Sequence, residues 1–126
     1  MKKIIIDLDG TLTTGKTTDY SRATPNEQVI KTLREYANKG FEIVIHTARN
    51  MRTHKGNVGK INVHTLPIIM EWLDRHGVPH DEIIVGKPWC GKEGFYVDDR
   101  ALRPSEFAQL TPEEIKVLLD KENPCS

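Results

Sequence analysis

Acidic side chains occur in pairs at two places in this 126-residue chain, and each pair follows a short apolar run. Asp7 and Asp9 come after residues 4–6, and residues 98–99 come after residues 94–97. Each run is too short for a helix and is typical of a buried strand. Two like charges are costly to bury unless a cation or hydrogen-bond donors compensate them. The first pair therefore predicts that a positively charged group lies beside it.

Two further reactive side chains follow predicted strands. Thr47 comes just after a strand predicted over 41–45, and Lys87 just after one over 82–85. Ligands of open α/β sheets bind beyond the carboxyl ends of the strands. Four consecutive strand ends thus carry an aspartate pair, a hydroxyl, a lysine and a second aspartate pair, which predicts one site at one edge of the sheet.

The intervening segments are predicted to be helices. Thr24 is expected to cap a helix that has Pro25 in its first position, Glu27 in a capping box and its end near Lys39. Further helices are predicted over 66–76 and from Thr111 to about 121, and residues 14–23 are expected to form a loop or small hairpin flap. Strands that alternate with helices predict a mainly parallel sheet in an α/β fold.

Composition limits the classes of function. The length suits a single domain over 1–126, and eighteen basic residues balance eighteen acidic ones, so nothing favours nucleic acid or a membrane surface as partner. No long apolar run suggests a membrane span, and no cleavable signal pattern precedes the first strand, so we expect a cytoplasmic protein. Cys90 and Cys125 are expected to be free thiols.

Asp7, Asp9, Gly10 and Thr11 form an Asp-x-Asp-Gly-Thr sequence that resembles motif one of the haloacid dehalogenase superfamily, most of whose members are magnesium-dependent phosphatases. The three later strand ends are similar to motifs two, three and four. The resemblance implies a three-layer α/β/α Rossmann-like fold. The segments in which larger relatives carry cap domains are too short here, so no cap is expected.

The resemblance assigns a role to each motif residue. Asp7 would be the nucleophile that forms an aspartyl-phosphate, and Asp9 the general acid and base. Thr47, Lys87 and the backbone around Gly10 would bind the phosphoryl group. These roles match what phosphoryl transfer requires, namely a nucleophile, a charge clamp and a proton shuttle. A leaving halide needs no proton, so the acid at Asp9 favours phosphate-ester cleavage over dehalogenation.

Magnesium is the expected cofactor, because hard oxygen ligands and retained waters suit it. By resemblance Asp7, the backbone carbonyl of Asp9 and Asp98 would hold the ion. Asp99 would either hold it through water or orient Lys87. The alternative for Asp98 and Asp99 is an ordinary acidic turn.

Residues 49–64 are predicted to form a polar, basic loop beside the site. Its cations would grip a second anionic group or hydroxyls of the substrate, or they form a solvated loop; they are Arg49, Arg52, Lys55 and Lys60. The sequence over 47–53 and 56–57 looks like small bacterial phosphatases of capsule or other surface-polysaccharide synthesis. That likeness indicates a small phosphorylated sugar as substrate.

An uncapped site is open to solvent, which motivates the hypothesis that a homo-oligomer covers it. Two alternatives for function stay open at this point. A phosphatase on nucleic-acid ends is disfavoured by zero net charge and the absence of an aromatic stacking pattern. A catalytically silent module that binds phosphorylated ligands would keep the fold without turnover.

Overall fold

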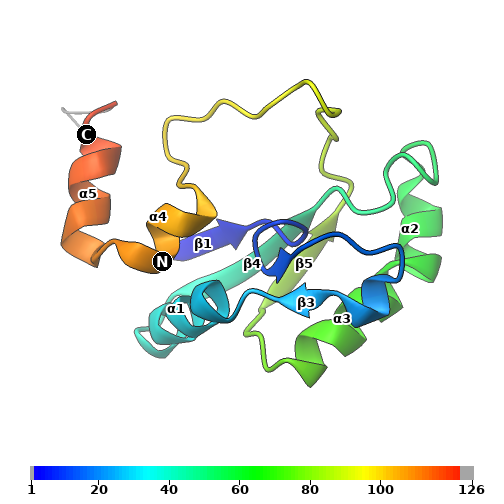
Figure 1. Cartoon of the computed structure of the whole chain (residues 1–126), viewed down its shortest axis with the longest axis horizontal. Coiled ribbons are helices and arrows are strands. Elements are labelled where there is room, and N and C mark those ends of the chain that lie inside the picture. Colours follow the sequence, from blue (N-terminus) through cyan, green and yellow to red (C-terminus); the bar gives the residue numbers. More distant parts are fainter. Residues whose placement is uncertain (1, 123–126) are drawn as a thin grey trace. The chain divides into compact units, whose positions relative to one another are not determined.

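The computed structural model describes residues 2–122 and divides the chain into two compact units, Met1–Trp89 and Cys90–Ser126. Figure 1 shows the first unit in blue to green and the second in yellow to red. Each unit is described by itself below. The expectation of a single domain over 1–126 stays a prediction.

A parallel sheet organises the first unit. Its strands are β1 (Lys3–Ile6), β4 (Glu42–Thr47) and β5 (Glu82–Val85), in the order β1-β4-β5 (Figure 1). Ile45 of β4 lies beside Ile6 on one side and Ile83 on the other. The fold is therefore α/β with a mainly parallel sheet, Rossmann-like and without a cap domain. Because all three strands run the same way, their carboxyl ends lie at one edge.

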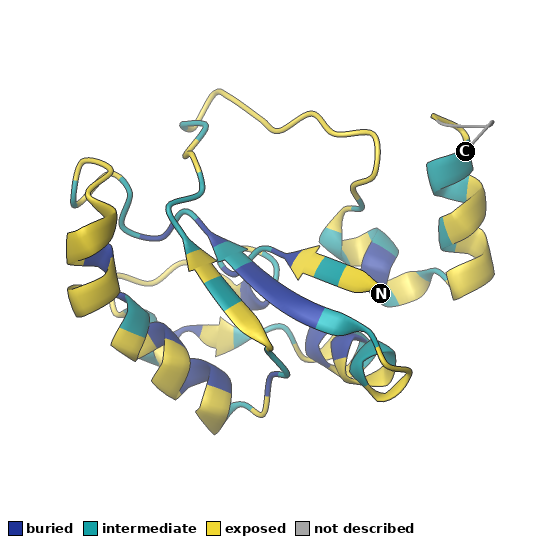
Figure 2. Cartoon of the chain, turned by 180° about the vertical axis from the view of Figure 1, so that it is seen from behind, coloured by how far each residue is buried: buried dark blue, intermediate teal, exposed yellow. Residues whose placement is uncertain are grey.

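Helices α1 (Glu27–Asn38), α2 (Val58–His64) and α3 (Leu66–Arg75) connect these strands. Both connections step in the same direction across the sheet, and right-handed crossovers then place the helices over the same face. Figure 2, seen from behind, shows the strands in front of α1 and α3. The buried residues between helices and sheet include Leu33, Ile43, Ile45, Ile69 and Trp72. Trp72 also donates from Nε1 to the carbonyl of Ala23 at 2.9 Å.

The face of this sheet opposite α1 and α3 carries apolar side chains, and some of them are exposed. Side chains alternate along a strand, so Ile5, its neighbour Val44 and Ile84 share that face. Ile5 is 64% exposed and Ile84 46% exposed, whereas Val44 is buried. Two apolar side chains of the outer strands are thus left in contact with solvent.

The segment after β1 forms a small hairpin, as expected for residues 14–23. Strand β2 (Thr13–Thr14) pairs antiparallel with β3 (Thr24–Pro25), and a 3-10 turn, η1 (Tyr20–Arg22), lies between them. The predicted start of the following helix is wrong by two residues: Asn26 is the N-cap, and its side chain accepts a hydrogen bond from the amide of Val29. Thr24 and Pro25 form strand β3 of the hairpin instead.

The predicted loop over 49–64 is wrong in its second half. Residues 58–64 form α2, capped by Asn57, whose Oδ1 accepts from the amide of Lys60 at 3.1 Å. Ile61 is fully buried, so a single apolar anchor holds a helix whose other side chains are polar or exposed. The helix predicted over 66–76 is confirmed as α3, one residue shorter.

In the second unit, the strand predicted over 94–97 is wrong. These residues belong to neither sheet, and Phe95 and Val97 are 79% and 87% exposed. A strand needs a hydrogen-bonded neighbour, which local strand propensity cannot supply. Helix α4 (Pro104–Gln109) was not predicted, whereas α5 (Pro112–Asp120) has the expected capping box at Thr111. In residues 2–122 no helix has the length and apolarity that a membrane span requires.

Candidate active site

Asp7 follows directly on β1 and lies close to Lys87, which follows β5. The Lys87 Nζ is 3.8 Å from the Asp7 Oδ1. Burial raises the pKa of the Asp7 carboxyl above its ordinary value of 3.8, although the Lys87 charge and hydrogen bonds from Leu8 and Thr11 act in the opposite direction. The carboxylate is therefore incompletely compensated, and a further cation beside it would be stabilising.

A tight turn carries the chain away from Asp7. The carbonyl of Leu8 accepts hydrogen bonds from the amides of Thr11, Leu12 and Thr13, and Leu8 and Leu12 are fully buried. Gly10 has a φ of +82°, which favours glycine. Its amide donates to Thr13 Oγ1 at 3.2 Å. The structure thus gives the Gly10 amide a protein acceptor, while its role toward phosphate stays a prediction.

Thr47 links the ends of β4 and β5. Its side chain is buried, and its Oγ1 accepts a hydrogen bond from the amide of Arg49 at 3.0 Å. Its carbonyl accepts from the amide of Lys87 at 3.1 Å. Accepting that bond leaves the hydroxyl hydrogen of Thr47 able to donate to another group. The structure therefore brings Asp7, Thr47 and Lys87 to adjacent strand ends, as the sequence predicted.

Arg49 forms a two-pronged ion pair with Asp9. Its Nε donates to Asp9 Oδ2 at 3.0 Å and its Nη2 to Asp9 Oδ1 at 2.7 Å. The Arg49 side chain is 1% exposed and that of Asp9 39%. The ring of Tyr20 in the hairpin stacks on the guanidinium, whose Cζ is 4.2 Å from the ring centroid. The Arg49 Nη1 is buried and has no hydrogen-bond partner in the described part of the chain.

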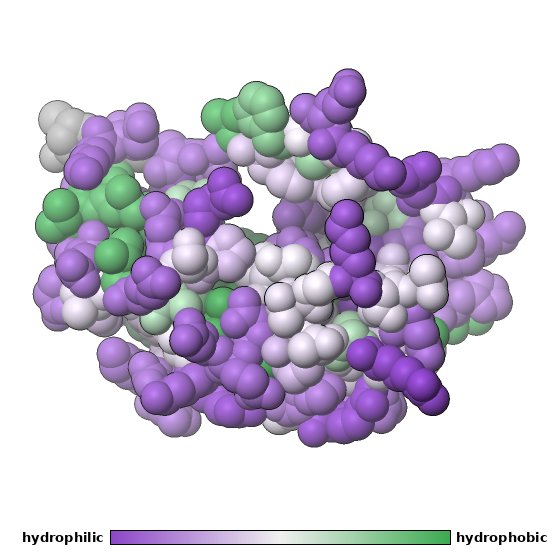
Figure 3. All heavy atoms as spheres, viewed as in Figure 1, coloured by the Kyte–Doolittle hydropathy of each residue, from purple (hydrophilic) through white to green (hydrophobic). Residues whose placement is uncertain are grey.

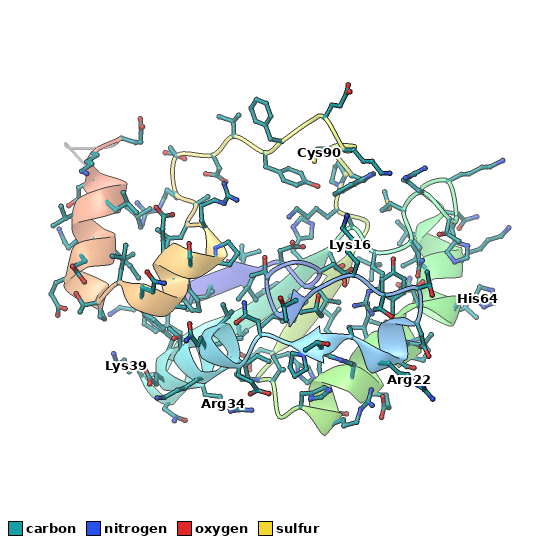
Figure 4. All side chains as sticks on the ribbon, viewed as in Figure 1. Lys16, Arg22, Arg34, Lys39, His64 and Cys90 are labelled. Carbon is teal, nitrogen blue, oxygen red and sulfur yellow. The ribbon has the colours of Figure 1, made fainter. Side chains whose placement is uncertain are left out.

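This ion pair was not predicted. Sequence reasoning placed Arg49 on a substrate loop, and no local pattern joins it to a carboxylate forty positions earlier or marks Tyr20. Burial and pairing distinguish Arg49 from Arg52, Lys55 and Lys60, which are all exposed. The exposure of these three side chains fits a solvated basic surface. That they bind the substrate stays a prediction. Figure 4 shows two further cations of the first unit, Lys16 and Arg22, projecting from the hairpin.

The turn between Arg49 and α2 is held by its own side chains. Asn50 adopts a φ of +60° and Lys55 one of +52°, both in the left-handed region. The Asn50 Oδ1 accepts a hydrogen bond from Thr65 Oγ1 at 2.7 Å, and its amide nitrogen donates to Thr53. The turn is thereby tied to the start of α3, which gives Arg49 a fixed backbone.

Asp98 and Asp99 are exposed and belong to the second unit. The Asp98 Oδ1 accepts a hydrogen bond from the amide of Arg100 at 2.9 Å, a local turn contact. Among residues 2–122, no group of three or more acidic, histidine or cysteine side chains is arranged to hold a metal ion. The oxygens that the first unit offers, the Asp7 carboxylate and the Asp9 carbonyl, are of the kind that magnesium prefers. These two oxygens suit magnesium chemically, but a complete magnesium site needs further oxygen ligands.

Comparisons with known proteins identify the family of the chain. A family model described as haloacid dehalogenase-like hydrolase matches residues 4–71, more than half of the chain. The crystal structure of a structural-genomics target from Vibrio cholerae is similar, with 67% sequence identity and a TM-score of 0.96, over 98% of this chain and 100% of that chain. No curated protein matches the sequence. The chain belongs to the haloacid dehalogenase-like hydrolases.

Proposed function

We propose that the protein is a magnesium-dependent phosphomonoester hydrolase that works through an aspartyl-phosphate on a small phosphorylated sugar. The observation that supports this most directly is the approach of the Lys87 ammonium to within 3.8 Å of the Asp7 carboxylate. A nucleophile beside a fixed cation is the arrangement that attack on a phosphoryl dianion needs, because the cation offsets the repulsion between the two anions.

In the first half of the reaction, a carboxylate oxygen of Asp7 attacks phosphorus. The bond from phosphorus to the ester oxygen breaks, and Asp9 gives a proton to that oxygen, so the alcohol leaves neutral. Lys87 and the Thr47 hydroxyl bind the phosphoryl oxygens and stabilise the charge that they gain in the transition state. The phosphoryl group is then bonded to Asp7.

In the second half, the deprotonated Asp9 accepts a proton from a water molecule. The water oxygen attacks phosphorus, and the bond between phosphorus and the Asp7 oxygen breaks. Inorganic phosphate leaves, Asp7 is again a carboxylate and Asp9 again carries a proton. Atoms and charge balance over the two halves, with one water consumed for each ester cleaved.

Arg49 adds a requirement to this cycle. Both oxygens of Asp9 accept hydrogen bonds from Arg49, but a general acid must carry a proton on one of them. The proton must therefore occupy a lone pair that Arg49 does not use, and the neutral acid then holds the guanidinium less strongly. A phosphoryl group accepts guanidinium donors as well as a carboxylate does, so an arriving substrate can compete for Arg49. The observed pair would then be the state between turnovers.

Magnesium would be held by the Asp7 carboxylate, the Asp9 carbonyl and Asp98, with Asp99 binding through water or orienting Lys87. When bound, the ion would neutralise negative charge on the phosphoryl oxygens. This proposal is supported by the uncompensated burial of Asp7 in the first unit.

The substrate class is the least constrained part of the proposal. The likeness of residues 47–53 and 56–57 to bacterial phosphatases of surface-polysaccharide synthesis favours a phosphorylated sugar. A phosphatase acting on nucleic-acid ends and a silent phosphoryl-binding module are the alternatives. Arg49 and Lys87 would contact only the phosphoryl group that all of these ligands share, so a substrate panel has to separate the alternatives.

Phosphate release from sugar phosphates, nucleotides, phosphorylated oligonucleotides and one aryl phosphate tests the proposal, with magnesium and with a chelator. Asp7→Asn should abolish release. The control Asp74→Asn should not, because Asp74 is exposed near the end of α3, which leads to the amino end of β5. Release that survives chelation or Asp7→Asn would contradict the mechanism. Binding of phosphorylated compounds without release would favour the silent module.

A further inference from the structure

The hairpin after β1 places an aromatic ring on the arginine that binds the candidate acid. Tyr20, in η1, lies over the Arg49 guanidinium, whose Cζ is 4.2 Å from the ring centroid. That distance is well inside the range of about 6 Å over which a cation is attracted to the face of an aromatic ring. The attraction is stronger where water is excluded, and the Arg49 side chain is 1% exposed. Tyr20 and Asp9 therefore both hold the Arg49 guanidinium.

Helix α3 sets the position of Tyr20. The carbonyl of Ser21 accepts a hydrogen bond from Nη2 of Arg75, and the carbonyl of Ala23 accepts one from Nε1 of Trp72 at 2.9 Å. Trp72 is fully buried, so its end of this connection is fixed in the core. The backbone that carries the Tyr20 ring is thereby tied to a packed helix.

The turn that carries Tyr20 is also closed by its own side chains. The Asp19 Oδ1 accepts hydrogen bonds from the amide of Ser21 at 3.1 Å and from its hydroxyl at 2.6 Å. The Thr17 Oγ1 accepts one from the amide of Asp19 at 3.0 Å. Figure 3 shows mostly purple and white atoms over the hairpin, and residues 14–19 are exposed. The outer surface of the hairpin is thus polar, and its inward contacts, which include the Tyr20 ring, hold it in place.

Arg49 in turn orients Asp9. Two hydrogen bonds from one guanidinium, from Nε at 3.0 Å and from Nη2 at 2.7 Å, hold both oxygens of the Asp9 carboxyl. A two-pronged bond of this kind fixes the plane of a carboxyl group as well as its distance. The Asp9 side chain is nevertheless 39% exposed, so part of it stays accessible to a substrate or a water molecule. The acid is oriented by Arg49 and still open to the reacting groups.

We infer that Tyr20 is a positioning residue for the acid–base step, on which it acts through Arg49. A ring over the central carbon of a guanidinium competes with none of its donors, because the N–H groups point outward in the guanidinium plane. Tyr20 can therefore keep its contact while the hydrogen bonds of Arg49 change partners. This inference rests on the proposed function for the role of Asp9, and it adds a residue of the hairpin to that function.

The contact with Tyr20 matters most when Asp9 carries its proton. A neutral acid holds a guanidinium less strongly than a carboxylate does. The attraction between Arg49 and the Tyr20 ring does not depend on the charge of Asp9, so in that state the ring keeps the guanidinium within reach of the acid. The first half of the reaction, in which Asp9 gives its proton to the ester oxygen, should therefore be the half that is most sensitive to loss of the ring.

Two substitutions of Tyr20 separate the ring from its hydroxyl. Tyr20→Phe keeps the ring and should stay within about twofold of wild-type kcat/KM, whereas Tyr20→Leu should lower kcat/KM on the best alkyl phosphate roughly tenfold, because the acid is then held out of place. Tyr36→Leu is the matched control and should have little effect. Tyr36 also faces a cation, the Lys39 Nζ at 5.3 Å, but lies near the end of α1 that leads to the amino end of β4. Wild-type rates in Tyr20→Leu, or an equal loss in Tyr20→Phe, would overturn the inference and leave the phosphatase intact.

The leaving group distinguishes positioning of the acid from a general loss of structure. The aryl ester p-nitrophenyl phosphate releases a phenolate that needs little help from an acid, whereas an alkyl phosphate releases an alkoxide that needs a proton. Tyr20→Leu should therefore lower kcat/KM on the aryl ester by only about twofold. In an Arg49→Met background it should cause no further loss on either substrate, because Tyr20 acts through Arg49. A loss of the same size on both substrates, or an additional loss in the Arg49→Met background, would overturn the inference.

A readout that needs no activity follows Arg49 itself. The Arg49 Nε–H is bonded to Asp9 on a buried side chain, so its NMR signal should exchange slowly with water, and the loss of that signal in Arg49→Met assigns it. Tyr20→Phe should keep the slow exchange, and Tyr20→Leu should speed it roughly tenfold or more. Unchanged exchange in Tyr20→Leu would overturn the inference. A wild type inactive on every compound would instead remove the proposed function, and the exchange rates would still decide whether Tyr20 holds Arg49.

Discussion

The two aspartate pairs have similar sequence surroundings and different structural ones. Asp7 and Asp9 follow a strand of the sheet, and each has a cation nearby, Lys87 at 3.8 Å and Arg49 at 2.7 Å. Asp98 and Asp99 follow a segment that is in neither sheet and are exposed. An apolar run before an acidic pair therefore does not determine its surroundings. Pairing of that run with a neighbouring strand does.

The difference also divides the chemistry. The first pair is partly buried and has the cations that a nucleophile and its acid need, whereas the second has only the carboxylates that a metal ion needs. Neither pair is complete without the other under the proposed mechanism. Variants that remove one feature at a time should therefore have graded effects, largest at Asp7.

Asp7→Asn should lower phosphate release by roughly a thousandfold or more, because an amide cannot serve as the nucleophile. Circular dichroism should show an unchanged fold. Asp98→Asn should instead lower the affinity for magnesium, so that raised magnesium recovers part of the rate. Equal and unrecoverable losses in both variants would show that the two pairs do not differ in role.

Lys87→Ala should lower kcat/KM roughly a hundredfold to a thousandfold, because it removes a fixed positive charge from the transition state. Lys92→Ala in the second unit is the matched control and should have little effect, since Lys92 is exposed. Steady-state kinetics on the best substrate measure both. An equal loss in the Lys92 variant would contradict the position assigned to Lys87.

Arg49→Met should lower the free energy of unfolding by about 1–3 kcal/mol, because it breaks an ion pair that is buried on the arginine side and partly exposed at Asp9. Urea titration measures the change. Arg100→Met should stay within about 0.5 kcal/mol as a surface substitution. Adding Asp9→Asn to Arg49→Met should recover part of the loss, and a full additional loss would contradict the pairing.

The smallest effect concerns the pH dependence of stability. The folded-state pKa of Asp7 is raised above 3.8, so the stability that the protonated group contributes is fully present below pH 3.8 and is lost as pH rises through the folded-state pKa. Without magnesium, the Tm of wild type relative to Asp7→Asn should therefore fall as pH increases through this range. A Tm difference independent of pH would contradict the burial assigned to Asp7.

Much of the site could be predicted from the sequence because its signals are local. Asp7 and Lys87 follow short apolar strands, and β5 begins and ends where the pattern placed it. The strand predicted over 41–45 is observed over 42–47, so Thr47 is the last residue of β4 and not a residue after it. The capping box at Thr111 likewise requires only four consecutive residues. Position at a common sheet edge then follows from the parallel arrangement.

Most of the features that were missed depend on residues far away in the sequence. Residues 94–97 have the composition of a strand, but pairing is decided by another part of a chain. Helix α2 was missed for a local reason, because its cap at Asn57 and its one buried residue, Ile61, leave little amphipathic pattern. The Arg49–Asp9 pair joins residues forty positions apart, which spacing rules do not describe. The motif residues could therefore be predicted from the sequence, whereas contacts between residues distant in the sequence could not.

The two tryptophans of the first unit differ in burial, so their fluorescence reports on different parts of it. Trp72 is fully buried and donates to Ala23 beside the hairpin, whereas Trp89, two residues after Lys87, is 47% exposed. The first should emit at shorter wavelength and resist acrylamide, and the second should be quenched readily. With Trp72→Phe in place, emission from Trp89 alone would follow dilution of the protein or addition of magnesium in real time, before any substrate is known.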